Sequence, residues 1–168
     1  DEGIGAGIIL KDEIYSGSFG YSGEISYAML KSFCDEPIDK SSLSLDTIVS
    51  ALNSELGENL GSIDDFLCKG SVFSRRMASV IGRVGDELGR IAALVSNIFG
   101  PEAVVVNGKL LDFGDVFFEA LRTSFESSLF SGDQVRLLAG NNDQFEAFST
   151  GAASYAIFSY LMSKALTD

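Results

Sequence analysis

Three glycines near the start of the chain, Gly3, Gly5 and Gly7, are followed directly by an apolar run. In a Rossmann turn or a P-loop, the glycines open a helix whose first amides hold a phosphate. Here an apolar run, a polar triplet and a second apolar pair follow, which predicts a strand, a tight turn and a strand within residues 4–15. Glycines at the mouth of such a hairpin either bring the backbone close to a phosphate or only permit positive φ and close backbone approach.

A Gly/Ser-rich loop, residues 16–26, follows the hairpin and carries one carboxylate, Glu24. Loops of this composition commonly carry ligand contacts. An ionised carboxylate can accept hydrogen bonds from two hydroxyl groups with defined directions. Glu24 is therefore either a ligand-binding group or a carboxylate that is simply solvated in a loop.

The composition excludes several classes of protein. The 168 residues contain no histidine, which removes Ser-His and Cys-His nucleophile systems and the commonest zinc ligand. A net charge of −12 argues against a surface that wraps a nucleic-acid backbone. Cys34 and Cys68 lie far apart, as expected of reduced thiols in a cytoplasmic protein. No apolar run in the sequence approaches the roughly 20 residues that a membrane span requires.

The rest of the sequence alternates amphipathic helices with short apolar strands. Apolar residues recur at three- and four-residue spacing from Met77 to Ile98, which predicts a long helix that ends at Gly100-Pro101. The segment 103–106 predicts a fully buried strand. Helices are expected at about 45–55, after an N-cap at Ser62, at 72–99, at 114–128 and at 144–166, with a further strand at 134–138. The predicted class is α/β, a mixed sheet packed by helices.

Two of the predicted helices could serve an interface. The helix at 144–166 carries a patch of small residues around Gly151 that would allow another backbone to approach closely. This helix and the one at 72–99 are both apolar enough to form a dimer interface, although packing in the core explains them equally well.

Four segments, in order along nearly the whole chain, resemble the ROK family of repressors, open reading frames and sugar kinases. They are GIGAGIIL, GYSGEI, PEAVVVNG and TGAASYAI. The resemblance implies a ribonuclease-H/actin-like ATPase lobe, in which the glycine hairpin is the second phosphate loop. Residues 1–168 would form the single C-terminal lobe, and the chain, which begins with Asp1 rather than Met, would be a fragment. The first lobe, with its phosphate loop and catalytic aspartate, is not in this sequence.

The resemblance also implies roles for individual residues. Gly23 and Glu24 would lie in a sugar pocket, where the carboxylate accepts hydrogen bonds from hydroxyl groups. The nucleotide of a kinase would lie against the hairpin glycines and the two later glycine motifs, which are Gly3, Gly5, Gly7, Asn107, Gly108 and Gly151. The last three of these are equally explained as a strand end and a helix contact.

Two departures from the family pattern bear on activity. Kinases of this family carry Gly-Thr before the GIG motif, whereas Asp1 and Glu2 stand there in this chain. Two carboxylates beside a phosphate site would repel a nucleotide, and such residues resemble those of the family's transcriptional regulators. Ser26 and Tyr27 replace the Gly-His pair whose histidine serves sugar and zinc in the family.

The family's zinc motif, CxCGxxGCxE, also has no counterpart. The best register places its three cysteines at Pro37, Asp39 and Ser44 and its final acid at Asp46. These residues cannot replace thiolates as a set, so no zinc or other metal site is expected. Asp46 points either into the sugar pocket or into solvent from the first turn of a helix, where the helix dipole favours an acid.

These observations favour a sugar-sensing lobe of a ROK transcriptional regulator, which binds an effector and dimerises but does not catalyse a reaction. DNA would be bound through a helix-turn-helix outside this sequence, and no cofactor is expected. The predicted sugar contacts are Gly23, Glu24, Tyr27 and Asp46, beside a vestigial nucleotide site. Two alternatives remain open: an ATP-dependent sugar kinase similar to glucokinase, and a degenerate scaffold that only dimerises.

Overall fold

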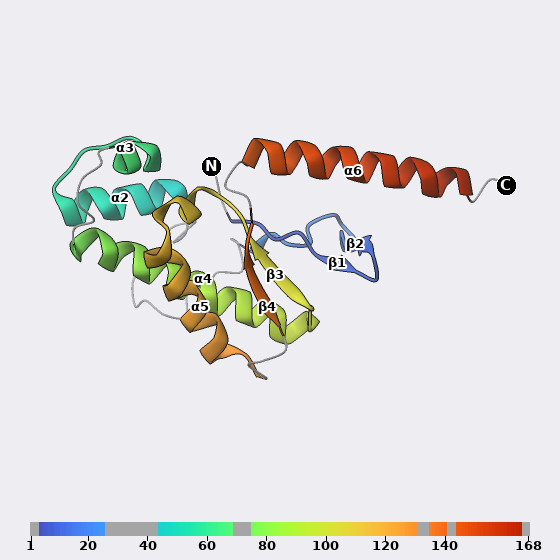
Figure 1. Cartoon of the computed structure of the whole chain (residues 1–168), viewed down its shortest axis with the longest axis horizontal. Coiled ribbons are helices and arrows are strands. Elements are labelled where there is room, and N and C mark those ends of the chain that lie inside the picture. The colour runs from blue at the N-terminus through green and yellow to red at the C-terminus, as the bar shows by residue number, and fades with distance from the viewer. Residues whose placement is uncertain (1–3, 26–43, 69–74, 131–134, 141–143, 166–168) are drawn as a thin grey trace.

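The computed structural model describes residues 4–25, 44–68, 75–130, 135–140 and 144–165 (Figure 1). Their elements are, in chain order, β1 (Ile9–Leu10), β2 (Glu13–Ile14), α2 (Leu45–Leu56), α3 (Ile63–Cys68), α4 (Arg75–Phe99), β3 (Ala103–Val106), the 3₁₀ helix η1 (Lys109–Phe113), α5 (Asp115–Ser128), β4 (Arg136–Ala139) and α6 (Gln144–Ala165). Within these ranges, none of the helices has the length and apolar character that crossing a membrane would require.

The described strands form two small sheets. β1 pairs antiparallel with β2, and Ile9 lies opposite Ile14, which confirms the predicted hairpin. β3 pairs parallel with β4, so that the chain crosses over through η1 and α5 between the two strands. The α/β class is confirmed. Among the described residues, antiparallel and parallel pairing occur in separate two-stranded sheets rather than in one continuous sheet.

The helix starts follow the local sequence. Ser44 caps α2, because its Oγ accepts a hydrogen bond from the Thr47 amide at 3.2 Å. At α3 the Ser62 Oγ accepts from the Asp65 amide at 3.2 Å, and the Asp65 carboxylate accepts from the Ser62 amide at 2.9 Å. This reciprocal pair is a capping box, and it confirms the N-cap predicted at Ser62.

Two glycines let α4 pack closely on α5. A Cβ at Gly85 would lie 2.5 Å from the carbonyl oxygen of Phe117, and a Cβ at Gly89 would overlap the carbonyl oxygen of Leu121. The two helix backbones therefore approach within a distance that only glycine permits at these two positions. The sequence did not single out either glycine for this role.

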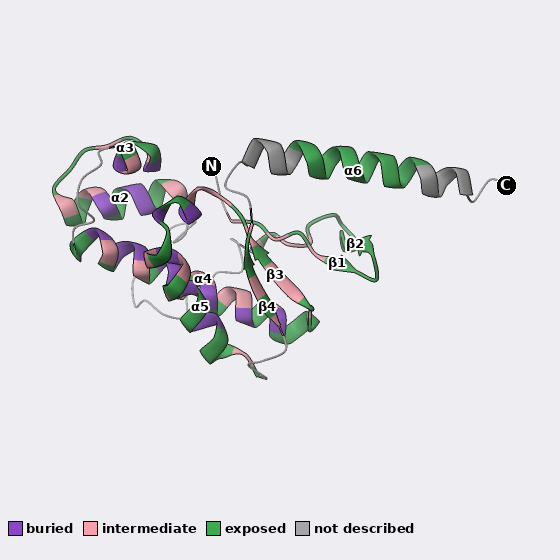
Figure 2. Ribbon diagram, viewed as in Figure 1, coloured by how far each residue is buried: buried purple, intermediate pink, exposed green. Residues whose placement is uncertain are grey.

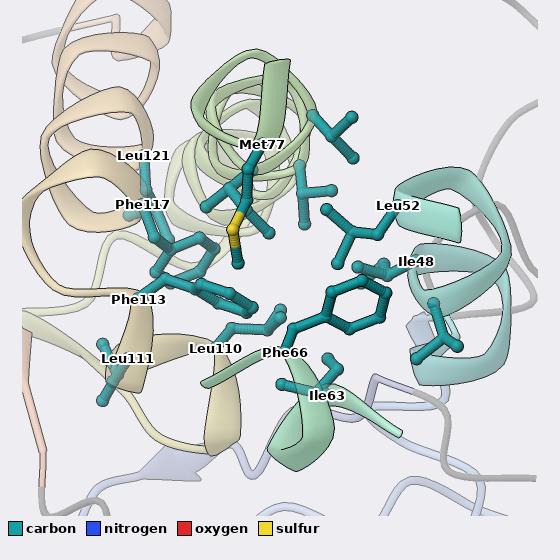
Figure 3. Close-up of a cluster of buried hydrophobic side chains, with 14 residues drawn as sticks. Ile48, Leu52, Ile63, Phe66, Met77, Leu110, Leu111, Phe113, Phe117 and Leu121 are labelled. Atoms are coloured by element: carbon teal, nitrogen blue, oxygen red, sulfur yellow. The ribbon is translucent and has the colours of Figure 1, made fainter. Parts of the chain in front are cut away.

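The core lies between the helices. Figure 3 shows side chains such as Met77, Phe66 and Phe113 pointing toward one another from α4, α3 and η1. The fully buried large side chains come from α2, α4, η1 and α5 and are Phe113, Phe117, Phe125, Ile48, Leu52, Ile81 and Leu121. Buried residues accordingly gather in this helical layer in Figure 2, while the hairpin and residues 149–160 of α6 are largely exposed.

The structure corrects the prediction that strand 103–106 is fully buried. Val105 is 55% exposed, and Leu138, its partner across the parallel pair, is exposed as well. The described residues therefore leave the face of the β3–β4 pair that carries these two side chains largely open. No atom of the described residues lies within 4 Å of a Cβ built at Gly151, so the predicted close approach at the small-residue patch of α6 is not made within this part of the chain, and its role in an interface stays a prediction.

Candidate functional site

The hairpin at the start of the chain ends in a tight two-residue turn. Lys11 and Asp12 have φ values of 53° and 65°, which is the pattern of a type I′ turn. Beyond the two strands, the Tyr15 amide donates to the Ile8 carbonyl at 2.8 Å. The hairpin pairing thus continues for one residue pair beyond its assigned strands, to Ile8 and Tyr15.

The Gly/Ser-rich loop folds back onto the segment that precedes β1. The Ala6 amide donates to the Gly23 carbonyl at 2.9 Å, and Gly23 has a φ of 91°. A Cβ at Gly23 would overlap the carbonyl oxygen of Ala6, so only glycine fits there. A Cβ at Gly5 would lie 3.9 Å from the Gly23 carbonyl oxygen. The structure therefore places the loop glycine Gly23 directly beside Ala6 and Gly5 of the hairpin segment.

Glu24 lies at the end of a turn in this loop. Its amide donates to the Tyr21 carbonyl at 3.4 Å, and the next amide, that of Ile25, donates to the Gly23 carbonyl at 2.7 Å. The Glu24 side chain is exposed, so its carboxylate is accessible to a ligand. An exposed acceptor on a turn fixed at both ends can hold hydroxyl groups in defined directions.

A second glycine-rich edge lies at the carboxyl ends of β3 and β4. Asn107 and Gly108 follow β3, and Gly140 follows β4 with its amide donating to the Val106 carbonyl at 2.8 Å. A Cβ at Gly140 would overlap the side-chain oxygen of Asn107. Ligands of open α/β sheets bind outside the carboxyl ends of the strands, so this edge is the second candidate surface.

Gly140 was not among the predicted site residues. The signal that could have found it is the repeated strand end, because both VVVNG and RLLAG finish an apolar run on glycine. Gly108 has a φ of 122° and starts η1, and its carbonyl accepts from the Leu111 amide at 3.0 Å. At Gly108 the edge is therefore built by backbone that glycine alone adopts readily.

The remaining predicted residues are spread over the chain. Asp46 is exposed in the first turn of α2, where an acid is favoured by the helix dipole. Gly151 is exposed on α6. Gly3 and Tyr27 lie outside the described residues, as do Asp1, Glu2, Pro37 and Asp39. Ser44, the third position aligned with a zinc cysteine, caps α2 instead.

A sequence model of the ROK family matches residues 1–157. The chain belongs to the ROK family. It is 28% identical over 141 residues to a Caldicellulosiruptor sp. (strain Rt8B.4) protein provisionally named a xylose repressor, an alignment covering 71% of this chain and 35% of that relative. The chain thus spans about a third of the length of the curated ROK relatives it matches.

Solved ROK structures confirm the actin-like ATPase fold. A ROK family transcriptional regulator, described as a homologue of the E. coli MLC protein, superposes with a TM-score of 0.68 at 20% identity, over 82% of this chain and 39% of that chain. The ROK hexokinase from Thermus thermophilus superposes with a TM-score of 0.69 at 16% identity, over 87% of this chain and 51% of that chain. Since regulators and kinases of this family share the fold, the fold alone does not choose between them.

Proposed function

We propose that this chain is the effector-binding lobe of a cytoplasmic, dimeric ROK transcriptional regulator, and that it senses a sugar without phosphorylating it. The observation that carries the proposal is the exposed Glu24 carboxylate on a turn that Gly23 fixes against the hairpin. The similarity to a protein provisionally named a xylose repressor makes xylose the first effector to test.

The chemistry of the site suits a neutral polyol. The Glu24 carboxylate accepts hydrogen bonds from two neighbouring hydroxyl groups, and such charge-assisted bonds contribute about 1.5–3 kcal/mol. Gly23 keeps the loop backbone close to Ala6, so the backbone that carries the Glu24 carboxylate is held in one place. In this proposal Tyr27 and Asp46 add further contacts to the sugar.

Regulation follows from differential binding. A sugar held by Glu24 would favour the closed arrangement of this lobe and a first lobe outside this sequence. Closure would alter the dimer and therefore the spacing of two DNA-binding heads. The net charge of −12 supports DNA contact through another part of the protein rather than through this lobe.

The nucleotide site is proposed to be vestigial. The family resemblance assigns the nucleotide to the hairpin glycines and to Asn107, Gly108 and Gly151, and in this proposal Gly140, which lies beside Asn107, belongs to the same edge. The two acids at Asp1 and Glu2, however, would repel its phosphates. The alternative, an ATP-dependent sugar kinase, is supported by the same fold in the Thermus hexokinase and makes the opposite prediction for Mg-ATP.

The test is a thermal-shift panel on the full-length protein, with xylose, other monosaccharides and sugar phosphates, each with and without Mg-ATP. Saturation at a hundred times the dissociation constant stabilises a protein by about 2.7 kcal/mol, which raises the melting temperature measurably. A shift with sugar alone supports the sensor. A shift with Mg-ATP supports the kinase, and no shift with any compound supports a scaffold that only dimerises.

A further inference from the structure

The loop that carries Glu24 also exposes two aromatic side chains. Phe19 is 85% exposed and Tyr21 is 77% exposed, both within residues 16–25. Isolated apolar side chains are common on protein surfaces, so exposure alone does not identify a ligand site. The two rings differ in their position relative to Glu24.

Tyr21 and Glu24 occupy the first and last positions of one turn. The Glu24 amide donates to the Tyr21 carbonyl, and the ends of such a turn lie within about 7 Å of each other. The turn is fixed on both sides, because the Ser22 amide donates to the Ser16 carbonyl at 3.3 Å and the Gly23 carbonyl accepts from Ala6. The ring and the carboxylate therefore project from one fixed piece of backbone. Phe19 lies outside this turn.

An aromatic ring and a carboxylate match the two surfaces of a pyranose sugar. The hydroxyl groups lie around the rim of the sugar and donate hydrogen bonds to a carboxylate. The axial C–H groups form an apolar face, and the electron-rich face of an aromatic ring attracts such weakly positive groups while both surfaces leave water. Small-molecule sites commonly combine aromatic surface with a few placed polar groups.

We propose that Tyr21 is a second sugar contact of the Glu24 site, with its ring packed on the C–H face of the pyranose. This inference rests on the proposed sugar-sensing function and adds a residue and a basis for specificity to it. β-Xylopyranose carries all of its hydroxyl groups equatorially, so both of its faces expose only C–H groups. Lyxose, its epimer at C2, places one hydroxyl axially and so interrupts a face. A Tyr21 ring packed on that face would therefore favour xylose over lyxose.

The test compares three variants of the full-length protein by calorimetric titration with xylose and with lyxose. Tyr21→Ala is expected to weaken xylose binding about tenfold. Tyr21→Phe keeps the ring and is expected to change the affinity for xylose less than about threefold. The preference for xylose over lyxose should fall in Tyr21→Ala and persist in Tyr21→Phe. Phe130→Ala, which removes a ring that is 97% exposed at the end of α5, is the matched control and should bind as the wild type does.

Tyr21 is largely exposed, so its removal should leave the melting temperature without sugar unchanged. The inference is overturned if Tyr21→Ala binds xylose within about twofold of the wild type or keeps the full preference over lyxose. If Glu24→Ala still abolishes binding in that case, the sugar-sensing function stands and only the role of Tyr21 is wrong. If the wild type binds no sugar, the proposed function fails, and the role of Tyr21 fails with it.

Discussion

In both the helical layer and the N-terminal loops, a glycine allows two backbone segments to approach closely, but the consequences differ. Gly89 lets α4 meet the Leu121 carbonyl of α5, and Gly23 lets the loop meet the Ala6 carbonyl of the hairpin. Around Gly89 the neighbouring side chains are buried, and Phe125 has no exposed surface. Around Gly23 the neighbouring Tyr21 and Glu24 are exposed.

This difference separates stability from binding in one small lobe. Close approach between α4 and α5 brings apolar side chains together, which stabilises the fold as a whole. Close approach between the loop and the hairpin buries little and instead fixes the backbone that carries an exposed acid and an exposed ring. Substitutions in the first region should therefore change the free energy of unfolding, and substitutions in the second should change ligand affinity.

The largest expected effect is the loss of a buried ring in the helical layer. Phe117 lies in α5 with no exposed surface, so Phe117→Ala should lower the free energy of unfolding by about 3–5 kcal/mol. Urea denaturation followed by circular dichroism measures it. Phe130→Ala is the control and should stay within about 0.5 kcal/mol of the wild type, because the ring is in solvent. Equal losses from both variants would contradict the assignment of the core.

The glycines of α4 provide a sharper comparison within one helix. Gly89→Ala should destabilise by about 1–3 kcal/mol, because its Cβ would meet the Leu121 carbonyl and push α5 away. Gly82→Ala should stabilise by about 0.5–1 kcal/mol, since open space surrounds its Cβ and alanine favours a helix. Thermal melts of the two variants would refute the close packing of α4 on α5 if both moved in the same direction.

Substitution of the loop glycine, Gly23, should change stability least among these variants, and its main effect should be on sugar binding. Gly23→Ala forces a Cβ against the Ala6 carbonyl at positive φ, and strain of about 1–3 kcal/mol can be relieved by movement of the exposed loop. We expect a small shift in melting temperature and a loss of the response to sugar. Gly20→Ala, also at positive φ but with open space around its Cβ, is the control for backbone strain alone. An unchanged sugar response in Gly23→Ala would show that the turn does not position the ligand group.

The elements that the sequence predicted well are those with a local signal. The hairpin follows from an apolar run, a polar triplet and a second apolar pair, and α4 follows from its three- and four-residue apolar spacing. The Ser62 cap depends on residues three positions apart and was likewise predicted. Periodicity and capping act over a few residues, so one sequence is sufficient to find them.

The features that were missed depend on residues far apart in the chain. Gly89 and Leu121, or Gly140 and Asn107, touch only because the fold brings them together, and no local pattern marks the pairs. The exposure of Val105 has the same origin, since burial of an apolar strand depends on what covers its outer face. Glu24 was singled out by family resemblance, and its position on a fixed turn could be learned only from the structure.

The most direct test of the central claim is a calorimetric titration of the full-length protein with xylose, comparing the wild type with Glu24→Ala. Glu126→Ala is the matched control, because Glu126 is an exposed carboxylate on α5. If Glu24 holds the sugar hydroxyls, Glu24→Ala should weaken binding by roughly 30-fold or more at an unchanged melting temperature, and Glu126→Ala should bind normally. Wild-type affinity in Glu24→Ala would contradict the account, because the turn at Gly23 would then not present the sugar-binding group.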